Sequence, residues 1–260
     1  MWAQASDGPL VAARHLGGGG PAIVFVHGVG STAAVWDDQL RAFGDAFQCF
    51  AVELRGNGAA QDPDPELITR VGFANDVVAI ADAAGIAQFH FVGCSLGGVV
   101  AFELWRQAPE RVLSLTLAGS FAAYPGAQAH ARAIADDVRA AGSMDAFTRK
   151  RVAGLDLPPD RLAETLEQMG RKSVPSYLAA TKATWTGDYR SMLGSITAST
   201  LVVCGELDTV APLVLSQEIA LGIVGARLEV IQGAGHVCNV DRPQEFNALL
   251  RSFLIGSPPV

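Results

Sequence analysis

Residues 89–98 read FHFVGCSLGG, which combines the end of an apolar run, a tight turn and the start of a helical pattern. The run FHFV stops at Gly93, and the helical pattern begins at Leu96. Ser95 has glycine two positions before it and two positions after it, which lets a strand and a helix pass closely around a strained turn. We therefore predict that Ser95 is a nucleophile exposed at the end of a strand. A glycine-rich turn that binds phosphate at a helix N-terminus is the alternative interpretation.

Apolar runs of the same kind occur on both sides of this stretch, at Pro21–Val26, Gln48–Val52, Val112–Ala118, Thr200–Cys204 and Leu228–Ile231. Continuous apolarity is typical of strands that are buried on both faces of a parallel sheet. Helical spacing of apolar residues appears between them, in Phe73–Ala84, Leu96–Gln107 and Pro243–Leu254. The alternation predicts a doubly wound, mostly parallel α/β sheet with right-handed crossovers.

One long segment breaks this alternation. Residues 121–193 contain alanine-rich, polar-faced helical patterns punctuated by glycine and proline, and they contain no apolar run of the strand type. The segment is too long for an ordinary connection between strands and too short to bury an independent core. We predict a helical cap at residues 121–193, inserted into a sheet core formed by residues 1–120 and 194–260.

The composition fits a folded globular chain and excludes several classes of protein. Half of the 260 residues are hydrophobic and 17% are charged, whereas disordered chains combine low hydrophobicity with high charge. The net charge of −7 has the wrong sign for nucleic-acid binding. No apolar run approaches the roughly 18 residues needed to cross a bilayer, and the first residues lack a signal-peptide pattern. We expect no nucleic-acid or membrane partner, and nothing in the sequence indicates an oligomer.

The four cysteines, at positions 49, 94, 204 and 238, lie far apart and form no C-x-x-C pair. Such free thiols are typical of a reducing compartment, so we expect a cytoplasmic location and no metal site. Cys94 directly precedes Ser95, and we expect it to be a small packed hydrophobe without a redox role.

A serine hydroxyl needs a base, and the base needs an acid that orients it. His236 lies in the glycine-rich turn GAGH before the last helix, and Asp208 follows the apolar run TLVVC. Because open α/β sheets place their sites at such strand ends, we expect Ser95, Asp208 and His236 to form a catalytic triad. Asp241 is a competing carboxylate, which we expect to cap the last helix, beginning at Pro243.

The oxyanion of a tetrahedral intermediate needs two preorganised N–H donors. We expect one from the backbone of Leu96, directly after the nucleophile. The other is expected from Val29 in the loop FVHGVG, where Gly28 and Gly30 allow the backbone to turn inward. His27 in the same loop is expected to brace it and not to act as a base.

These motifs resemble the α/β-hydrolase superfamily over nearly the whole chain, and most closely its capped branch of esterases and enol-lactonases of the 3-oxoadipate type. The stretches that carry the resemblance are VHGVGSTAAVW, ELRGNG, FVGCSLGGVVAFELW, PERVLSLTLAGS, LVVCGELDTVAP and GAGHVCNVDRPQEFNALLRSFL. The chain departs from the family at Glu53 and Asn57, where the pattern D-x-R-G-x-G usually has aspartate and histidine. Val35 precedes Trp36 where carbon–carbon hydrolases of ring-cleavage products usually have asparagine, which weakens that assignment.

The resemblance implies an α/β-hydrolase that cleaves a small carboxylic ester or lactone without a cofactor. The residues expected to line its substrate pocket are Trp185, Phe121, Val210 and Val237. Three alternatives share the same fold: a carbon–carbon bond hydrolase, a cofactor-free oxygenase or perhydrolase, and a ligand receptor with slow turnover.

Overall fold

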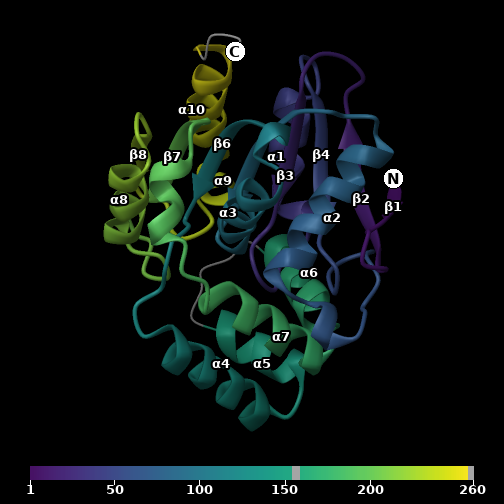
Figure 1. Ribbon diagram of the computed structural model, residues 1–260. Coiled ribbons are helices and arrows are strands. Elements are labelled where there is room, and N and C mark those ends of the chain that lie inside the picture. The colour runs from purple at the N-terminus through teal and green to yellow at the C-terminus, as the bar shows by residue number, and fades with distance from the viewer. Residues whose placement is uncertain (154–158, 257–260) are drawn as a thin grey trace.

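The computed structural model describes residues 1–153 and 159–256. It contains one eight-stranded sheet with the strand order β1-β2-β4-β3-β5-β6-β7-β8 (Figure 1). The strands are β1 (Trp2–Gln4), β2 (Leu10–Leu16), β3 (Ala22–Val26), β4 (Gln48–Glu53), β5 (Phe89–Cys94), β6 (Val112–Ala118), β7 (Ser199–Gly205) and β8 (Arg227–Ile231). All neighbours from β4 to β8 pair in parallel, whereas β2 pairs antiparallel with both β1 and β4.

The parallel strands lie in the buried centre of the fold because their sequences are apolar. Every residue of β3 is buried, because both faces of the sheet are covered and a polar side chain there would lose its water. All six apolar runs identified in the sequence form strands, and β6 has the expected bounds. The prediction of a doubly wound, mostly parallel sheet is confirmed.

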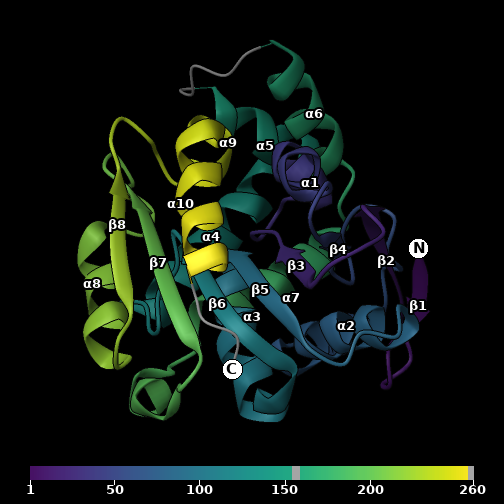
Figure 2. The same cartoon turned by 90° about the horizontal axis from the view of Figure 1, so that it is seen from above.

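Helices cover both faces of this sheet (Figure 2). On one face, α2 (Arg70–Ala83), α3 (Leu96–Gln107) and α8 (Leu213–Gly222) share one apolar cluster with the strands. On the other face, α1 (Asp37–Phe43) and α10 (Pro243–Gly256) pack with Trp36 in a second cluster. The short helical turns are η1 (Ala33–Trp36), η2 (Pro65–Leu67), η3 (Pro109–Arg111), η4 (Arg190–Ser195) and α9 (Cys238–Asp241). None of the described helices is both long and apolar enough to span a membrane.

Two strands precede the first one expected from the sequence. The sequence interpretation started the sheet at Pro21, but β1 and β2 form an antiparallel extension at the edge next to β4. The pattern of β2, LVAARHL, hides this strand, because its first and last three residues are exposed and only the three between them are buried. A short edge strand of this kind has neither the continuous apolarity of the central strands nor a clean alternation.

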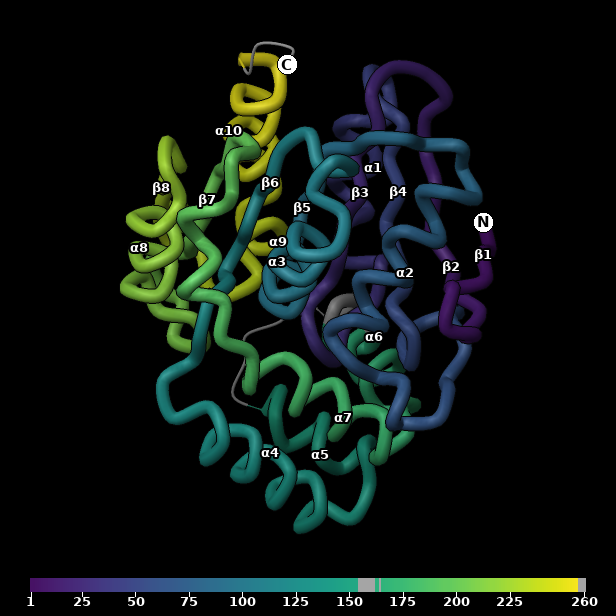
Figure 3. Tube along the Cα trace, viewed as in Figure 1, coloured from purple at the N-terminus to yellow at the C-terminus, as the bar shows by residue number. Residues whose placement is uncertain are grey.

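The chain between β6 and β7 forms four helices, α4 (Ala127–Ala141), α5 (Met144–Val152), α6 (Pro159–Gly170) and α7 (Val174–Trp185). Residues 154–158 of this segment lie outside the described residues. Figure 3 shows the chain leaving β6 and running directly into α4, so these helices gather beyond the carboxyl end of that strand. An antiparallel bridge between Ala123 and Asp188 holds the two ends of the segment together. We refer to α4–α7 as the inserted helices.

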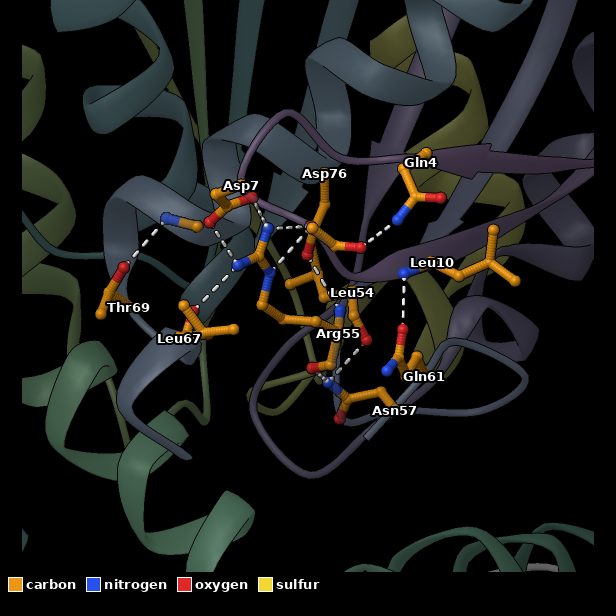
Figure 4. Close-up of polar contacts among 12 residues, drawn as sticks. Gln4, Asp7, Leu10, Leu54, Arg55, Asn57, Gln61, Leu67, Thr69 and Asp76 are labelled. Carbon is orange, nitrogen blue, oxygen red and sulfur yellow. Dashed lines mark hydrogen bonds and ion pairs between the residues drawn. The ribbon is translucent and has the colours of Figure 1, made fainter. Parts of the chain in front are cut away.

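Arg55, two residues after β4, fixes the turn that follows this strand. Figure 4 shows its guanidinium between Asp7 of the β1–β2 connection and Asp76 of α2. All five guanidinium N–H groups are used, because Nε and Nη2 donate to Asp76, Nη1 and Nη2 donate to Asp7, and Nη1 also reaches the Leu67 carbonyl. Arg55 and Asp76 are fully buried, so the paired charges hold three separate segments at one point.

Candidate active site

Ser95 occupies the turn between β5 and α3 in a strained conformation. Its φ of 54° makes it the one non-glycine residue with positive φ among the described residues, and such a backbone costs about 1–3 kcal/mol. The surrounding chain holds it there: the Ser95 N–H donates to the Ala118 carbonyl at 2.9 Å, and the Ser120 hydroxyl donates to the Ser95 carbonyl at 2.9 Å.

The glycines that flank Ser95 are needed for space. A Cβ at Gly93 would lie 2.4 Å from the carbonyl carbon of Gly97, and a Cβ at Gly97 would lie 2.2 Å from the carbonyl oxygen of Val26. Both distances are well below contact, so β5, α3 and β3 meet here only because these positions lack side chains. The turn therefore has the geometry that the G-x-S-x-G pattern predicts.

Asp208 and His236 form a hydrogen-bonded pair. His236 Nδ1 lies 2.9 Å from Asp208 Oδ2, while Asp208 Oδ1 accepts the N–H groups of Val210 and Ala211 at 2.8 Å each. The Asp208 side chain is fully buried, whereas that of His236 is 20% exposed. Each carboxylate oxygen thus has a fixed partner, and the exposed part of the imidazole remains available to a reacting group.

The end of β6 brings this pair next to Ser95. Ala118 accepts the Ser95 N–H, and a Cβ built on the following residue, Gly119, would lie 3.2 Å from both Asp208 Oδ2 and His236 Nδ1. No hydrogen bond joins Ser95 Oγ to His236 among the described residues. Such contacts often tighten only when substrate binds, so the two groups lie at one strand end in an arrangement that suits nucleophilic chemistry.

The expected role of Asp241 is wrong. Its Oδ2 accepts the N–H of Gly235 at 2.7 Å, and Asp241 is the last residue of α9 and not the cap of α10. The carboxylate therefore braces the turn that carries His236, because the Gly235 N–H, directly before His236, points toward α9. Asp241 supports the histidine loop, and Asp208 contacts the histidine itself.

The loop between β3 and η1 approaches Ser95 from the other side. A Cβ at Gly28 would lie 3.3 Å from the Ser95 Cβ, so the loop backbone passes directly over the serine. Within the described residues, no hydrogen bond engages the N–H of Val29 or of Leu96. Two unengaged donors on either side of the serine suit an oxyanion, and their role as oxyanion donors stays a prediction.

His27 braces this loop. Its Nδ1 lies 2.8 Å from the Gly28 carbonyl, and its Nε2 accepts the N–H of Leu54 at 3.3 Å. Nδ1 therefore carries the proton, and burial lowers the pKa of His27 to about 3. A neutral imidazole with both nitrogens engaged cannot act as a base here, which confirms the structural role expected for His27.

Aromatic side chains from the inserted helices and from the connection between β6 and α4 lie beside the Asp208 loop. Phe121 and Trp185 are both buried and stack at 5.1 Å with 8° between their planes. Tyr124 packs edge-on against both rings, and its hydroxyl donates to the Val210 carbonyl at 3.2 Å. His130 of α4 packs against Tyr124 and Trp185. Sequence analysis named Phe121 and Trp185 but missed Tyr124 and His130, because local patterns do not show how α4, α7 and the connection before α4 pack together.

The remaining sequence candidates lie close in the chain to members of the predicted triad, but not in one cluster. Val210 is half-buried and packs against the core cluster of α2, α3 and α8, while Val237 is half-buried against the cluster on the opposite face. Cys94 is buried, and burial raises the pKa of its thiol to about 12, which agrees with the expected packing role. No group of three His, Cys, Asp or Glu that could hold a metal ion occurs in residues 1–153 and 159–256.

Residues 23–249 match the family described as the alpha/beta hydrolase family. The chain belongs to this family. As an α/β-hydrolase, it is 31% identical to 3-oxoadipate enol-lactonase 2 of Acinetobacter baylyi over 233 residues, which cover 87% of this chain and 86% of that protein. It is 29% identical over 262 residues to a protein of Azorhizobium caulinodans named "Putative carbamate hydrolase RutD", with 97% of each chain covered.

A solved structure of a hydrolase from Pseudomonas aeruginosa superposes on this α/β-hydrolase with a TM-score of 0.84 and 28% identity, covering 98% of this chain and 97% of that one. The resemblance noted in the sequence is therefore confirmed, and the chain is a hydrolase of the esterase and lactonase branch.

Proposed function

We propose that this hydrolase cleaves a small carboxylic ester or lactone through an acyl-enzyme intermediate on Ser95. The observation that supports this most strongly is the His236–Asp208 pair, with Nδ1 and Oδ2 at 2.9 Å, beside the strained turn of Ser95. Because Asp208 accepts the Nδ1 proton, Nε2 is the nitrogen left with a lone pair, which is the tautomer that a general base requires.

In the first half of the reaction, Ser95 Oγ attacks the carbonyl carbon while His236 Nε2 takes the hydroxyl proton. The imidazolium that forms is stabilised by the Asp208 carboxylate. The Val29 and Leu96 N–H groups stabilise the oxyanion, and loss of one such donor typically costs 10²–10³ in kcat. Collapse of the tetrahedral intermediate breaks the bond to the leaving oxygen, which receives the proton from His236.

In the second half, His236 takes a proton from water, and the resulting hydroxide equivalent attacks the acyl carbon. The bond to Ser95 Oγ breaks, His236 returns the proton to Ser95, and the carboxylic acid leaves. A lactone releases its alcohol and acid as one hydroxy acid. Every proton and electron pair in this cycle has a donor and an acceptor among these residues, substrate and water, so the mechanism requires no cofactor.

We further propose that residues 121–193 act as a cap whose base supplies part of the substrate pocket. Phe121 and Trp185 would form one apolar wall with Val210 beside them, and Val237, directly after His236, would contribute apolar surface from the other cluster. The four cysteines are free and buried, the state typical of a reducing compartment, so we propose that the reaction takes place in the cytoplasm.

The substrate class rests on the relatives. The 31% identical protein is named as an enol-lactonase, which supports an ester or lactone. A carbamate is the second candidate, because the relative named for that activity matches over 97% of the chain. Both reactions begin with attack on a carbonyl carbon that carries an oxygen leaving group or an amine, so the same residues would serve either one.

The test is Ser95→Ala, with Ser252→Ala on the exposed face of α10 as the control. We expect Ser95→Ala to lose on the order of 10⁴–10⁶ in kcat on short p-nitrophenyl esters, while binding of the product acid and the melting temperature change little. A fluorophosphonate should label Ser95 alone by peptide mass. Labelling at another serine, or more than a tenth of wild-type turnover in Ser95→Ala, would contradict the proposal.

A panel of acyl esters, lactones, enol lactones and carbamates then separates the substrate classes. Steady turnover on any of them argues against a ligand receptor. Oxygen uptake, peroxide-dependent halogenation, or cleavage restricted to carbon–carbon bonds would instead favour the corresponding alternative activity.

A further inference from the structure

Lys172, in the connection between α6 and α7, reaches from the inserted helices to the sheet. Its Nζ donates to the Asn57 side-chain oxygen and to the Ser31 carbonyl, the latter at 3.4 Å. Asn57 belongs to the turn after β4, and Ser31 to the loop that carries Val29. One ammonium group therefore connects the inserted helices to two segments of the sheet core, each more than a hundred residues away from Lys172 in the chain.

The orientation of Asn57 is fixed by its own neighbours. Its Nδ2 donates to the carbonyls of Leu54 at 3.1 Å and Arg55 at 2.9 Å, and Figure 4 shows the side chain folded back onto this turn. Both amide protons are used, so Oδ1 is the atom that faces outward to accept from Lys172. Arg55, held in turn by two aspartates, keeps the whole turn rigid.

Glu53, the other position where the chain departs from the usual family pattern, contacts the same loop. Its Oε2 accepts the N–H of Ala33 at 3.2 Å. The carboxylate is buried over Gly58, where a Cβ would lie 2.2 Å from Oε2. Burial lowers the pKa of Lys172 to about 8, against the opposing effect of the Glu53 and Asp62 carboxylates. The cluster thus places a half-buried cation near a buried anion.

The loop between β3 and η1 also contacts the inserted helices directly. A Cβ at Gly30 would lie 3.3 Å from both Met169 and Tyr177, so the backbone of the loop packs against these side chains. Thr32 Oγ1 donates to Gln168 Oε1 at 2.7 Å. Beside these contacts, a cleft of about 570 Å³ lies between the inserted helices and the core, lined in part by Thr32, Gln168 and Lys172. Polar contacts therefore join the insertion to this loop where apolar packing ends.

From this arrangement we propose that Lys172 is a positioning residue, which holds the loop of residues 28–33 so that the Val29 N–H points at the oxyanion. The inference rests on the proposed function, because it assigns the Val29 N–H to the oxyanion of the Ser95 reaction. Lys172 does not touch the reacting atoms. It acts through the Ser31 carbonyl, two residues after Val29, and through the Asn57 turn that backs the loop.

The test compares Lys172→Met, which keeps the length of the side chain but removes its charge and donors, with Lys182→Met as the control. Lys182 is exposed on α7 and lines a different cleft, beside α2 and α3. In Lys172→Met we expect kcat on a short ester to fall about 10- to 100-fold, a part of the 10²–10³ that a lost oxyanion donor costs. KM and the affinity for the product acid should stay within twofold. Lys182→Met should match wild type.

Active-site labelling with a fluorophosphonate separates positioning from folding. A positioning role lowers the rate constant of Ser95 labelling in parallel with kcat while every molecule is still labelled at completion. A merely structural role lowers the labelled fraction and leaves the rate constant of the remaining molecules unchanged, and that result would overturn the inference. If Lys172→Met does not fold, Lys172→Gln removes the charge but retains an amide NH₂ with two N–H donors, and it is measured in the same way, with the same two outcomes.

The two proposals fail separately. Wild-type protein that is not labelled at Ser95 contradicts the proposed function. Wild-type protein that is labelled at Ser95, together with Lys172→Met that reacts at the wild-type rate, leaves the proposed function standing and refutes the role of Lys172.

Discussion

Asp208→Asn is the substitution for which the contacts predict the sharpest effect. Oδ1 of Asp208 accepts two backbone N–H groups, from Val210 and Ala211, at 2.8 Å. In the variant, the amide oxygen must take this place, because an NH₂ group facing two N–H donors would leave all of them without acceptors. The NH₂ group is then forced into the position of Oδ2, opposite His236 Nδ1.

An amide NH₂ at this position can only donate, so His236 must present an unprotonated Nδ1 to it. The proton moves to Nε2, and the imidazole can no longer take the proton of Ser95. We expect a loss of roughly 10⁴ in kcat, which corresponds to about 5.5 kcal/mol of transition-state stabilisation. The melting temperature should change by only a few degrees, since the loop keeps its two backbone hydrogen bonds.

Asp241→Asn is the matched control, because Asp241 is a second carboxylate beside the same histidine loop. The one hydrogen bond that its side chain makes within the described part of the chain, from the Gly235 N–H, can be made equally well by an amide oxygen, so kcat should fall less than threefold. The assay is steady-state and burst kinetics on a short p-nitrophenyl ester, with the imidazole tautomer read from ¹⁵N chemical shifts. A kcat within tenfold of wild type in Asp208→Asn, or a hundredfold loss in Asp241→Asn, would refute this assignment of the acid.

Three further outcomes follow from the contacts described above. Cys94→Ala should retain most of the wild-type activity, because a thiol with a pKa near 12 is not a reactive thiolate. For the same reason, wild-type activity should not depend on added thiol reductant. Inactivation by peroxide that disappears in the variant would contradict this. His27 is neutral when folded and titrates near 6.5 when unfolded, so its contribution to stability is complete above pH 6.5 and is lost as the pH falls toward 3. The unfolding free energy of wild type relative to His27→Gln, measured by urea titration, should therefore shrink by up to about 1.4 kcal/mol per pH unit below pH 6, and a constant difference would argue against a buried neutral imidazole. Trp185→Ala should change the ratio of kcat/KM between short and long acyl chains about tenfold or more while turnover of short esters persists, whereas an equal loss on all esters would mark Trp185 as purely structural.

The central sheet could be predicted from the sequence because its signals are local. β6 and α3 have the bounds that their apolar patterns indicate. The glycines around Ser95 predict the tight turn between β5 and α3. Strands buried on both faces tolerate few polar residues, so sequence and burial agree there. The edge strands β1 and β2 are exposed along much of their length, and for that reason their pattern carries little information.

The residues of the candidate site divide in the same way. Ser95, Asp208 and His236 follow strand ends in a recognisable order, so topology alone brings them to one edge of the sheet. The contact between Lys172 and Asn57 spans 115 positions in the chain, and it depends on how the inserted helices lie over the core. The role of Asp241 was missed for a related reason, since α9 turns its carboxylate back toward Gly235 instead of forward to α10. Neither arrangement has a signature in local sequence.

The strained backbone of Ser95 also has an evolutionary consequence. A glycine at this position would adopt the φ of 54° without steric cost, so Ser95→Gly should melt at a higher temperature than the wild-type protein while losing the nucleophile. Selection for stability therefore favours glycine at position 95, whereas selection for activity favours serine. A library sorted only for thermal resistance would accumulate inert glycine variants, whereas the serine persists only under selection for turnover.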